Sequence, residues 1–375
     1  LEWIQPGLPL AHPLDGGRAA FMARSVNDTI ASLPEVDATP YENIFAPLSQ
    51  KAPALMDDLL GPFPFPPKHP LLLARFGRHA IRSGTGFAQS VFQSEEARAL
   101  FAGNAAHSIL PLEQPFTAAV GIMLAVTGHY AGWPFAKGGS GQIAAALTKY
   151  YLSLGGEIIC NHPVSHLDQL PQAKSYFFDT SPPALADIAQ DSLPATYQEK
   201  LRRYRYGPAM FKLELALAQP IPWLAEPCRR AGTVHVGGSL PEIAASERDA
   251  WKNRVSEKPF VLVAQQSLFD DTRAPDGKHT CWAYCHVPHA CPEDMTLPIL
   301  NQIERFAPGF RDTILASHQT SPAAFARYNP NFVGGDIIGG VQDLAQMFTR
   351  PVARLNPYTT PNPELFLCSA STPPG

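Results

Sequence analysis

A helix enclosed by two glycine pairs in the middle of the chain constrains the fold more than any other sequence feature. Gly138 and Gly139 precede residues 143–154, whose apolar side chains recur at helical spacing, and a second glycine pair ends that pattern. Residues 157–160 then predict a short strand, and residues 175–178 predict another. Helix, glycine pair and strand in succession are typical of α/β layers that bind nucleotides. The sequence therefore predicts an α/β fold of mixed, α+β character.

The rest of the chain changes from helical to strand-rich character. Helical patterns predominate up to about residue 130, and strand patterns predominate from about residue 205 to 290. The predicted helices are 25–33, 52–60, 95–102, 116–127, 298–305 and 341–348, and the predicted strands are 209–215, 232–237, 260–265, 279–287 and 365–368. Residues 62–70 (PFPFPPKHP) fit neither helix nor central strand and predict a loop.

Composition and charge exclude several classes of protein. A hydrophobic content of 45% excludes a disordered chain, and a net charge of −4 with a pI near 6.3 gives no electrostatic basis for binding nucleic acid. The longest apolar run, 118–127, is about half of the roughly 20 residues that a membrane helix needs. Six cysteines do not suggest a disulfide scaffold, so we expect a reducing, cytoplasmic compartment. Both ends of the sequence look cut, so we expect that a targeting segment is missing from it.

Residues 139–144 (GSGQIA) match the glycine pattern of a dinucleotide-binding fingerprint, and Glu157 lies at a suitable distance beyond them. The context argues against a fingerprint, because one follows a buried strand and residues 132–137 (GWPFAK) stand here instead. Two interpretations stay open. Either the glycines line a helix N-terminus that lets a flat or anionic group approach the backbone, or Ser140 is a plain helix cap.

A cluster of three cysteines and three histidines occupies residues 279–291. Its spacing matches no paired zinc motif, whereas its alternation predicts a strand with Cys281 and Cys285 on one face and Trp282 and Tyr284 on the other. Small residues that share a face favour cysteines packed in a core. A metal-dependent hydrolase is therefore the least favoured hypothesis, and no G-x-S-x-G nucleophile motif is present.

Two charged clusters have ordinary explanations. Asp270 and Asp271 are adjacent and would point to opposite sides of an extended chain, so we expect them to cap the turn before residues 272–275. The arginines within residues 202–206 could hold a phosphate or a carboxylate, but a solvated face is the favoured interpretation for most of the run.

The tail combines a predicted apolar strand, 365–368, with small residues that follow it directly. Small side chains just past a strand let a ligand approach the backbone, and the carboxyl ends of strands are where α/β sheets bind ligands. Residues 334–336 (GGD) and 339–340 (GG) add a second loop that is poor in side chains. The alternative, that both are merely tight turns, stays open.

Several phrases of this sequence stand in the order found in one family of flavoproteins. They are residues 132–134 (GWP) with 138–139 (GG), 231–238 (AGTVHVGG), 271–275 (DTRAP), 282–288 (WAYCHVP), 303–310 (IERFAPGF), 329–336 (NPNFVGGD) and 367–375 (LCSASTPPG). On these residues the chain resembles phytoene-desaturase-like FAD-dependent oxidoreductases, in the branch named pyridine nucleotide-disulfide oxidoreductase domain-containing proteins. The resemblance covers nearly the whole chain.

The resemblance implies a flavoprotein with a partial FAD-binding α/β domain and a substrate domain that carries a mixed, largely antiparallel sheet and helices. The implied parts are a mostly helical substrate-domain part (1–130), an FAD-domain segment (131–190), the substrate-domain sheet and helices (191–330) and a C-terminal FAD-domain segment (331–375). Gly138 and Gly139 match a glycine pair near the flavin, and Val164 matches a position whose backbone meets the adenine. The implied cofactor-binding residues are Gly138, Gly139, Val164, Gly335, Asp336, Ser369, Ala370, Ser371, Thr372 and Gly375.

The same resemblance implies a hydride transfer from a small, mostly apolar substrate to FAD, with peripheral contact to a membrane as a further expectation. No catalytic side chain is implied. Relatives open with a βαβ unit that bears the FAD fingerprint and close with a glycine-rich turn and a helix, and this sequence has neither. We therefore expect the chain to hold FAD weakly. The alternative is a non-catalytic binding protein that retains the apolar substrate domain. The glycine clusters near residues 138, 335 and 375 are expected to converge on one flavin cleft.

Overall fold

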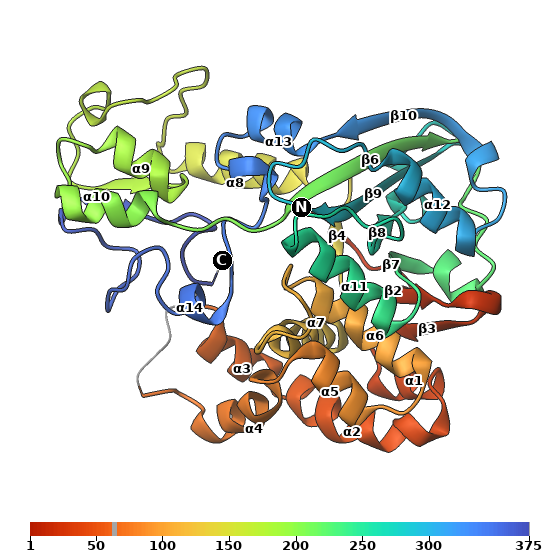
Figure 1. Ribbon diagram of the computed structural model, residues 1–375. Coiled ribbons are helices and arrows are strands. Elements are labelled where there is room, and N and C mark those ends of the chain that lie inside the picture. The colour runs from red at the N-terminus through yellow and green to blue at the C-terminus, as the bar shows by residue number, and fades with distance from the viewer. Residues whose placement is uncertain (62–65, 375) are drawn as a thin grey trace.

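A seven-stranded mixed sheet is the centre of the computed structural model, which describes residues 1–61 and 66–374 (Figure 1). Its strands, in spatial order, are β10 (Ile314–Thr320), β6 (Ala209–Leu217), β9 (His279–Val287), β8 (Val261–Ala264), β7 (Ala231–Val236), β2 (Leu8–Pro13) and β3 (Ala19–Met22). All neighbours pair antiparallel except β2 and β7, which are parallel. The predicted mixed α/β fold with a largely antiparallel sheet is confirmed.

One face of this sheet is covered by α12 (Thr296–Phe306). Alternate residues of β6 and β9, among them Phe211, Cys281 and Cys285, pack there against Ile299 and Ile303 of the helix. The predicted packing of the cysteines in a core is confirmed. Burial raises the pKa of the Cys281 thiol to about 12, so it stays protonated and inert at neutral pH.

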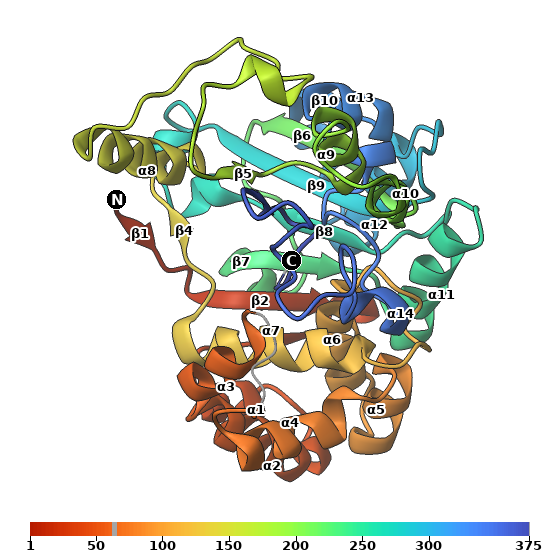
Figure 2. The ribbon, with the colours of Figure 1, turned by 90° about the vertical axis from the view of Figure 1, so that its left-hand side faces the viewer.

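A helical lobe covers the lower part of the opposite face (Figures 1 and 2). It consists of α1 (Val26–Ala31), α2 (Glu35–Ser49), α3 (Ala52–Leu59), α4 (Pro70–Ala80), α5 (Gly84–Val91), α6 (Glu95–Ala106) and α7 (Thr117–Ala131), with α11 (Leu240–Trp251) packed against α6. Gly103 of α6 lies so close to His235 of β7 that an added Cβ would sit 2.6 Å from its Nδ1 atom. Small residues in α6 therefore bring the lobe and the sheet into direct contact.

A small second layer lies on the side of the large sheet away from α12 (Figure 2). Its strands β5 (Tyr176–Phe178) and β11 (Leu365–Leu367) form a parallel pair, and α9 (Pro182–Ile188) and α10 (Ala195–Arg202) cover one face of that pair. The remaining elements are β1 (Trp3–Ile4), β4 (Phe135–Ala136), α8 (Gly141–Ser153), α13 (Pro322–Tyr328) and α14 (Leu344–Met347). No helix among residues 1–61 and 66–374 is long and apolar enough to cross a membrane.

Two predicted elements are wrong. Residues 157–160 form no strand, because the segment is exposed and pairs with no other strand in the described part of the chain. The predicted helix 341–348 shrinks to α14, which begins only after Asp343 caps the Gln346 amide at 3.0 Å. The loop predicted over 62–70 falls partly on residues 62–65, which lie outside the described residues, and the helix α4 already begins at Pro70.

Candidate functional site

A glycine-rich loop, residues 334–340, is built around a buried carboxylate. Asp336 is fully buried, and its two oxygens accept hydrogen bonds from the amides of Gly207 (2.8 Å) and Ile338 (2.9 Å). Burial raises the pKa of Asp336, although these amide donors act against the rise. The carboxylate thus holds the loop against the start of β6, where an added Cβ on Gly335 would meet Ala209 and Pro322.

This loop meets the small residues that follow β11. The carbonyl oxygen of Gly339 accepts hydrogen bonds from Ser371 Oγ at 2.8 Å and from Tyr204 Oη at 2.9 Å. Burial raises the pKa of Tyr204 to about 12, so its phenol remains a donor. Gly339 has a φ of +76°, and a Cβ there would lie 2.7 Å from that of Ala370. Two of the three predicted glycine clusters are therefore in contact.

Residues 369–372 form a tight turn at the carboxyl ends of β5 and β11. The Ser369 hydroxyl accepts a hydrogen bond from the Ser371 amide at 3.2 Å, and the Ser369 carbonyl accepts one from the Thr372 hydroxyl at 2.7 Å. Just before the turn, the Cys368 amide donates to the Phe178 carbonyl at 2.9 Å and extends the parallel pair. Carboxyl ends of parallel strands are where α/β layers bind ligands. Gly375 lies outside the described residues.

The turn between β4 and α8 carries the third glycine cluster, Gly138 and Gly139, and lies apart from the C-terminal segment (Figure 2). The expected convergence of all three clusters on one cleft is therefore not observed. The Gly138 amide donates to Asp270 Oδ2 at 2.7 Å, and Gly139 packs against the guanidinium of Arg273. Asp270 also accepts the Thr272 amide at 3.1 Å, which confirms its predicted role as a turn cap. Because these contacts hold the glycine turn to the 270–273 loop, the predicted approach of a flat or anionic group to this turn stays a prediction. The alternative, a plain helix cap at Ser140, is wrong, because the Ser140 side chain makes no capping hydrogen bond.

The strand before this turn does not resemble a fingerprint strand. β4 has two residues and pairs antiparallel with β1, which agrees with the sequence argument against a dinucleotide fingerprint at 139–144. Val164 is half-buried in an irregular segment after α8. Its predicted place beside an adenine stays a prediction.

An aromatic wall, Trp282 and Tyr284, stands on the face of β9 opposite the buried cysteines. The two rings stack with centroids 5.6 Å apart and planes 15° apart, and both are half-buried. Directly across on β6, Lys212 and Glu214 form an ion pair of 2.8 Å. The alternation of β9 predicts this face, but no motif in the sequence marks the face as part of a site. The wall faces the side on which the C-terminal segment lies (Figures 1 and 2).

The histidines and cysteines of residues 279–291 do not gather at one point. The cysteines point toward α12, whereas Nδ1 of His286 faces Glu247 Oε2 at 2.7 Å on the other side of the sheet. Among residues 1–61 and 66–374, no group of three or more His, Cys, Asp or Glu side chains has metal-binding geometry. The arginines of residues 202–206 form surface ion pairs, for example Arg205 with Asp343 at 2.7 Å, as the solvated-face interpretation predicts.

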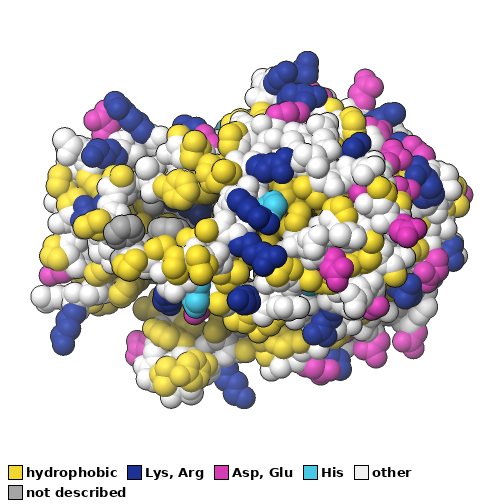
Figure 3. Space-filling view, turned by 90° about the horizontal axis from the view of Figure 1, so that it is seen from below, with side chains coloured by type: hydrophobic (Ala, Val, Ile, Leu, Met, Phe, Trp, Pro, Cys, Tyr) yellow, Lys and Arg dark blue, Asp and Glu magenta, His cyan; other side chains and the backbone are white. Residues whose placement is uncertain are grey.

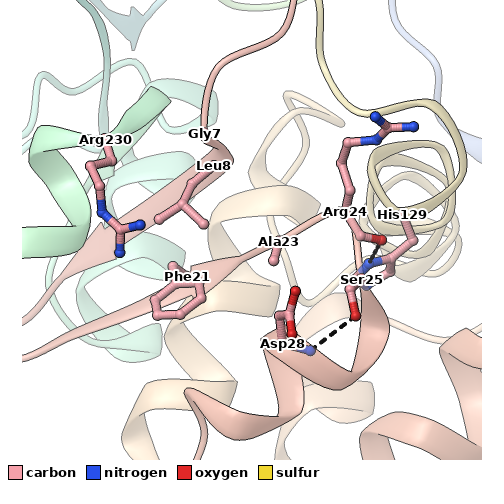
Figure 4. A pocket seen from close by; sticks show the side chains of 9 residues that line it. All are labelled: Gly7, Leu8, Phe21, Ala23, Arg24, Ser25, Asp28, His129 and Arg230. Atoms are coloured by element: carbon pink, nitrogen blue, oxygen red, sulfur yellow. Dashed lines mark hydrogen bonds between the residues drawn. The ribbon is translucent and has the colours of Figure 1, made fainter.

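A separate hollow of about 600 Å³ lies where β2 and β7 begin and β3 ends (Figure 4). Leu8, Phe21 and Ala23 form its apolar part, and Arg24 and Arg230 stand at opposite sides of it. None of the glycine loops contributes to its lining. Since the two guanidinium groups do not converge, this hollow gives no basis for assigning a ligand.

The fold as a whole is shared with solved oxidoreductases. An oxidoreductase from Methanosarcina mazei aligns with 99% of this chain and 77% of its own, with a TM-score of 0.62 and 14% identity. Putrescine oxidase, solved with putrescine bound, aligns with 98% of this chain and 76% of its own, with a TM-score of 0.56 and 13% identity. No protein-family model and no curated protein sequence matches the chain.

The contact between Gly339 and Ala370 is open to a direct test with Gly339→Ala. We expect a loss of about 1 kcal/mol for the left-handed backbone and a further ~1–3 kcal/mol for the contact with Ala370. Gly277→Ala is the matched control, because Gly277 has a φ of +68° but nothing within 4 Å of an added Cβ. Urea unfolding of both variants measures the difference, and equal losses would show that the two segments do not touch.

Proposed function

We propose that the chain belongs to an FAD-dependent oxidoreductase of the desaturase or dehydrogenase type that acts on a mostly apolar substrate. The observation that carries this proposal is the meeting of residues 334–340 with residues 369–372 at the carboxyl ends of β5 and β11. The shared fold with solved oxidoreductases, one of them a putrescine oxidase by name, supports the reaction class. The family resemblance supports FAD as the cofactor.

The C-terminal loops offer a cradle that suits a dinucleotide. Gly339 and Gly340 are buried with φ values of +76° and +122°, and an added Cβ would meet Ala370 at the first and Tyr204 at the second, so these glycines let residues 334–340 pack closely against the turn 369–372. Ser369, Ser371 and Thr372 are small and their hydroxyl groups are engaged in the turn. The turn is therefore held in shape before a ligand arrives, which lowers the entropy lost on binding.

In such a protein FAD supplies a flavin ring that accepts a hydride, and the protein supplies orientation and exclusion of water. Trp282 and Tyr284 pack partly against the core of the helical lobe, and the parts of their rings that stay exposed offer an apolar surface for an unsaturated or aliphatic substrate. Burial raises the pKa of Tyr284, so its phenol stays neutral and adds no charge to this surface. The Lys212–Glu214 ion pair lies beside the aromatic wall on the neighbouring strand β6 and adds no net charge.

We further propose that an additional α/β segment of the same polypeptide completes the cofactor layer. No residue of α8 is buried, although Leu147, Tyr150, Tyr151 and Leu154 give it an apolar face. Phe177 of β5 is 69% exposed and stacks on Phe366, so one face of the parallel pair is uncovered. Parallel strands are normally covered on both faces, which makes an α/β segment the natural partner. Hydrophobic side chains also gather around a hollow in the space-filling view (Figure 3).

The proposal predicts saturable but weak binding of FAD to this chain. Titration followed by flavin fluorescence should saturate, whereas gel filtration should leave little of the flavin absorbance near about 450 nm with the protein. The physical reason is that the diphosphate of a dinucleotide normally rests on a helix N-terminus of a βαβ unit. Absence of saturable binding would contradict the assignment of FAD as the cofactor. Stoichiometric yellow protein after gel filtration would contradict the need for a further segment.

A further inference from the structure

Arg350 is a buried cation that has no anionic partner among the described residues. The residue is 5% exposed, and no carboxylate of the described residues lies within ion-pairing distance of its guanidinium. One Nη2 donor bonds to the Pro374 carbonyl at 2.5 Å, and its Nε has no partner. Arg305, by contrast, contacts the carboxylates of both Asp15 and Glu242. Arg350 is thus an exception that requires a physical reason.

Burying a charge is costly unless the charge is paired and hydrogen-bonded. Burial lowers the pKa of Arg350, but from so high a value that the group keeps its charge at neutral pH. The neighbouring Tyr204 is a neutral phenol, and both carboxylate oxygens of the buried Asp336 accept hydrogen bonds from backbone amides. Among the described residues, the surroundings of the Arg350 guanidinium therefore supply no negative charge.

The position of Arg350 indicates which anion belongs there. Arg350 follows α14, and its side chain bonds to the backbone at Pro374. Pro374 lies just beyond the turn 369–372 and the carboxyl ends of β5 and β11. The guanidinium fork matches the oxygens of phosphate groups, which it binds through paired, charge-assisted hydrogen bonds. Residues 334–340 offer no other cation, since their side chains are apolar, absent or acidic.

We propose that Arg350 is the anion-binding residue of this site and takes the diphosphate of a dinucleotide. The inference rests on the proposed function for the choice of a dinucleotide. A phosphate oxygen accepts the free Nε–H and displaces the Pro374 carbonyl from Nη2. The rival explanation is purely structural: Arg350 ties down residues 373–374 and binds nothing.

Calorimetric titration with inorganic pyrophosphate, ADP and FAD at low ionic strength separates these explanations. The wild-type chain should bind ADP and FAD more tightly than pyrophosphate, and Arg350→Gln should weaken all three at least tenfold. Arg354→Gln is the matched control, because Arg354 lies four residues on, is exposed and bonds only to Thr359 and Thr360. Its affinities should equal those of the wild type.

The overturning results are equally specific. Unchanged affinities in Arg350→Gln, or no binding of any probe by the wild type, would leave Arg350 a structural tie. Equal, Arg350-dependent affinities for pyrophosphate and ADP would assign a free phosphate and overturn the dinucleotide. If Arg350→Gln does not fold, NMR of the wild type replaces it. The Nε–H resonance of Arg350, assigned by its absence in Arg350→Lys, should shift when pyrophosphate is added. A resonance that does not shift would refute the proposal. Pyrophosphate binding without FAD binding would refute the flavin function alone.

Discussion

Lowering the pH from about 6.5 to 4 is expected to destabilise this protein steeply, because four imidazoles, three buried and one half-buried, are held in uncharged form. Burial lowers the pKa of His12 to about 4, that of His107 to about 3 and that of His129 to about 4. The pKa of His235 is lowered well below its usual value by burial and by the neighbouring His107 and His12.

The sign follows from proton binding. Above pH 6.5 these histidines are neutral in both the folded and the unfolded chain and contribute no pH dependence. Between pH 6.5 and about 4 the unfolded chain binds protons that the folded chain does not, so the free energy of unfolding falls as pH falls. Each such histidine contributes up to about 1.4 kcal/mol per pH unit in this range.

The geometry explains why protonation is so unfavourable. Nε2 of His107 lies 3.0 Å from Nε2 of His235, so only one of the two nitrogens can carry the shared proton without repulsion. The Nε2–H group of His12 donates to the Gly238 carbonyl, 2.7 Å away, and its Nδ1 has no partner among the described residues. The carboxylates of Glu242 and Glu95 favour the charged form of His12, but burial outweighs them, and Glu247 is already paired with His286.

Urea unfolding at a series of pH values measures this dependence. His12→Gln should reduce the slope of unfolding free energy against pH by about 1.4 kcal/mol per unit. His162→Gln is the control, because His162 is exposed and its replacement should leave the slope unchanged. A free energy of unfolding that stays constant from pH 6.5 to 4.5 would contradict the burial of neutral histidines.

Truncating two helical leucines is expected to have very different effects. Leu55 of α3 is fully buried in the helical lobe, so Leu55→Ala should cost about 2–5 kcal/mol for lost contacts and the cavity left behind. Leu147 of α8 is 65% exposed, so Leu147→Ala should change the stability by less than about 0.5 kcal/mol.

Both leucines lie within helices, so intrinsic helix propensity favours the two alanines equally and cancels from the comparison. Urea midpoints with a common m-value give the two free energies. Similar losses in both variants would mean that the apolar face of α8 is covered in solution, for instance by a second copy of the chain. Sedimentation of the two variants distinguishes that case.

Sequence reasoning works here where the pattern is local. The alternation over 279–287 predicts β9 residue for residue, and the 3.6-residue period of 143–154 predicts α8. It fails where pairing is remote. β2 (LPLAHP) has every residue buried and contains two prolines, and its parallel partner β7 lies more than two hundred residues along the chain, so no local signal marks it as a strand.

The same limit applies to the candidate site. Small residues at 369–372 and glycines at 339–340 are visible in the sequence, and the structure brings them together. The missing charge partner of Arg350 is not visible, because a lone arginine in a sequence reads as a surface residue until its burial is known. The EIIC segment at 157–160 has strand-forming residues but finds no neighbour in the described chain, so its propensity alone does not make a strand.

The pairing of Tyr176 with Leu365 has a consequence for synthesis of the protein. During translation β5 leaves the ribosome long before β11 exists, and the large sheet and α12 are completed in between. Throughout that interval β5 carries an unsatisfied edge and the exposed ring of Phe177. The nascent chain is therefore prone to aggregate while β5 is unpaired, and the emergence of residues 365–367 satisfies the open edge of β5.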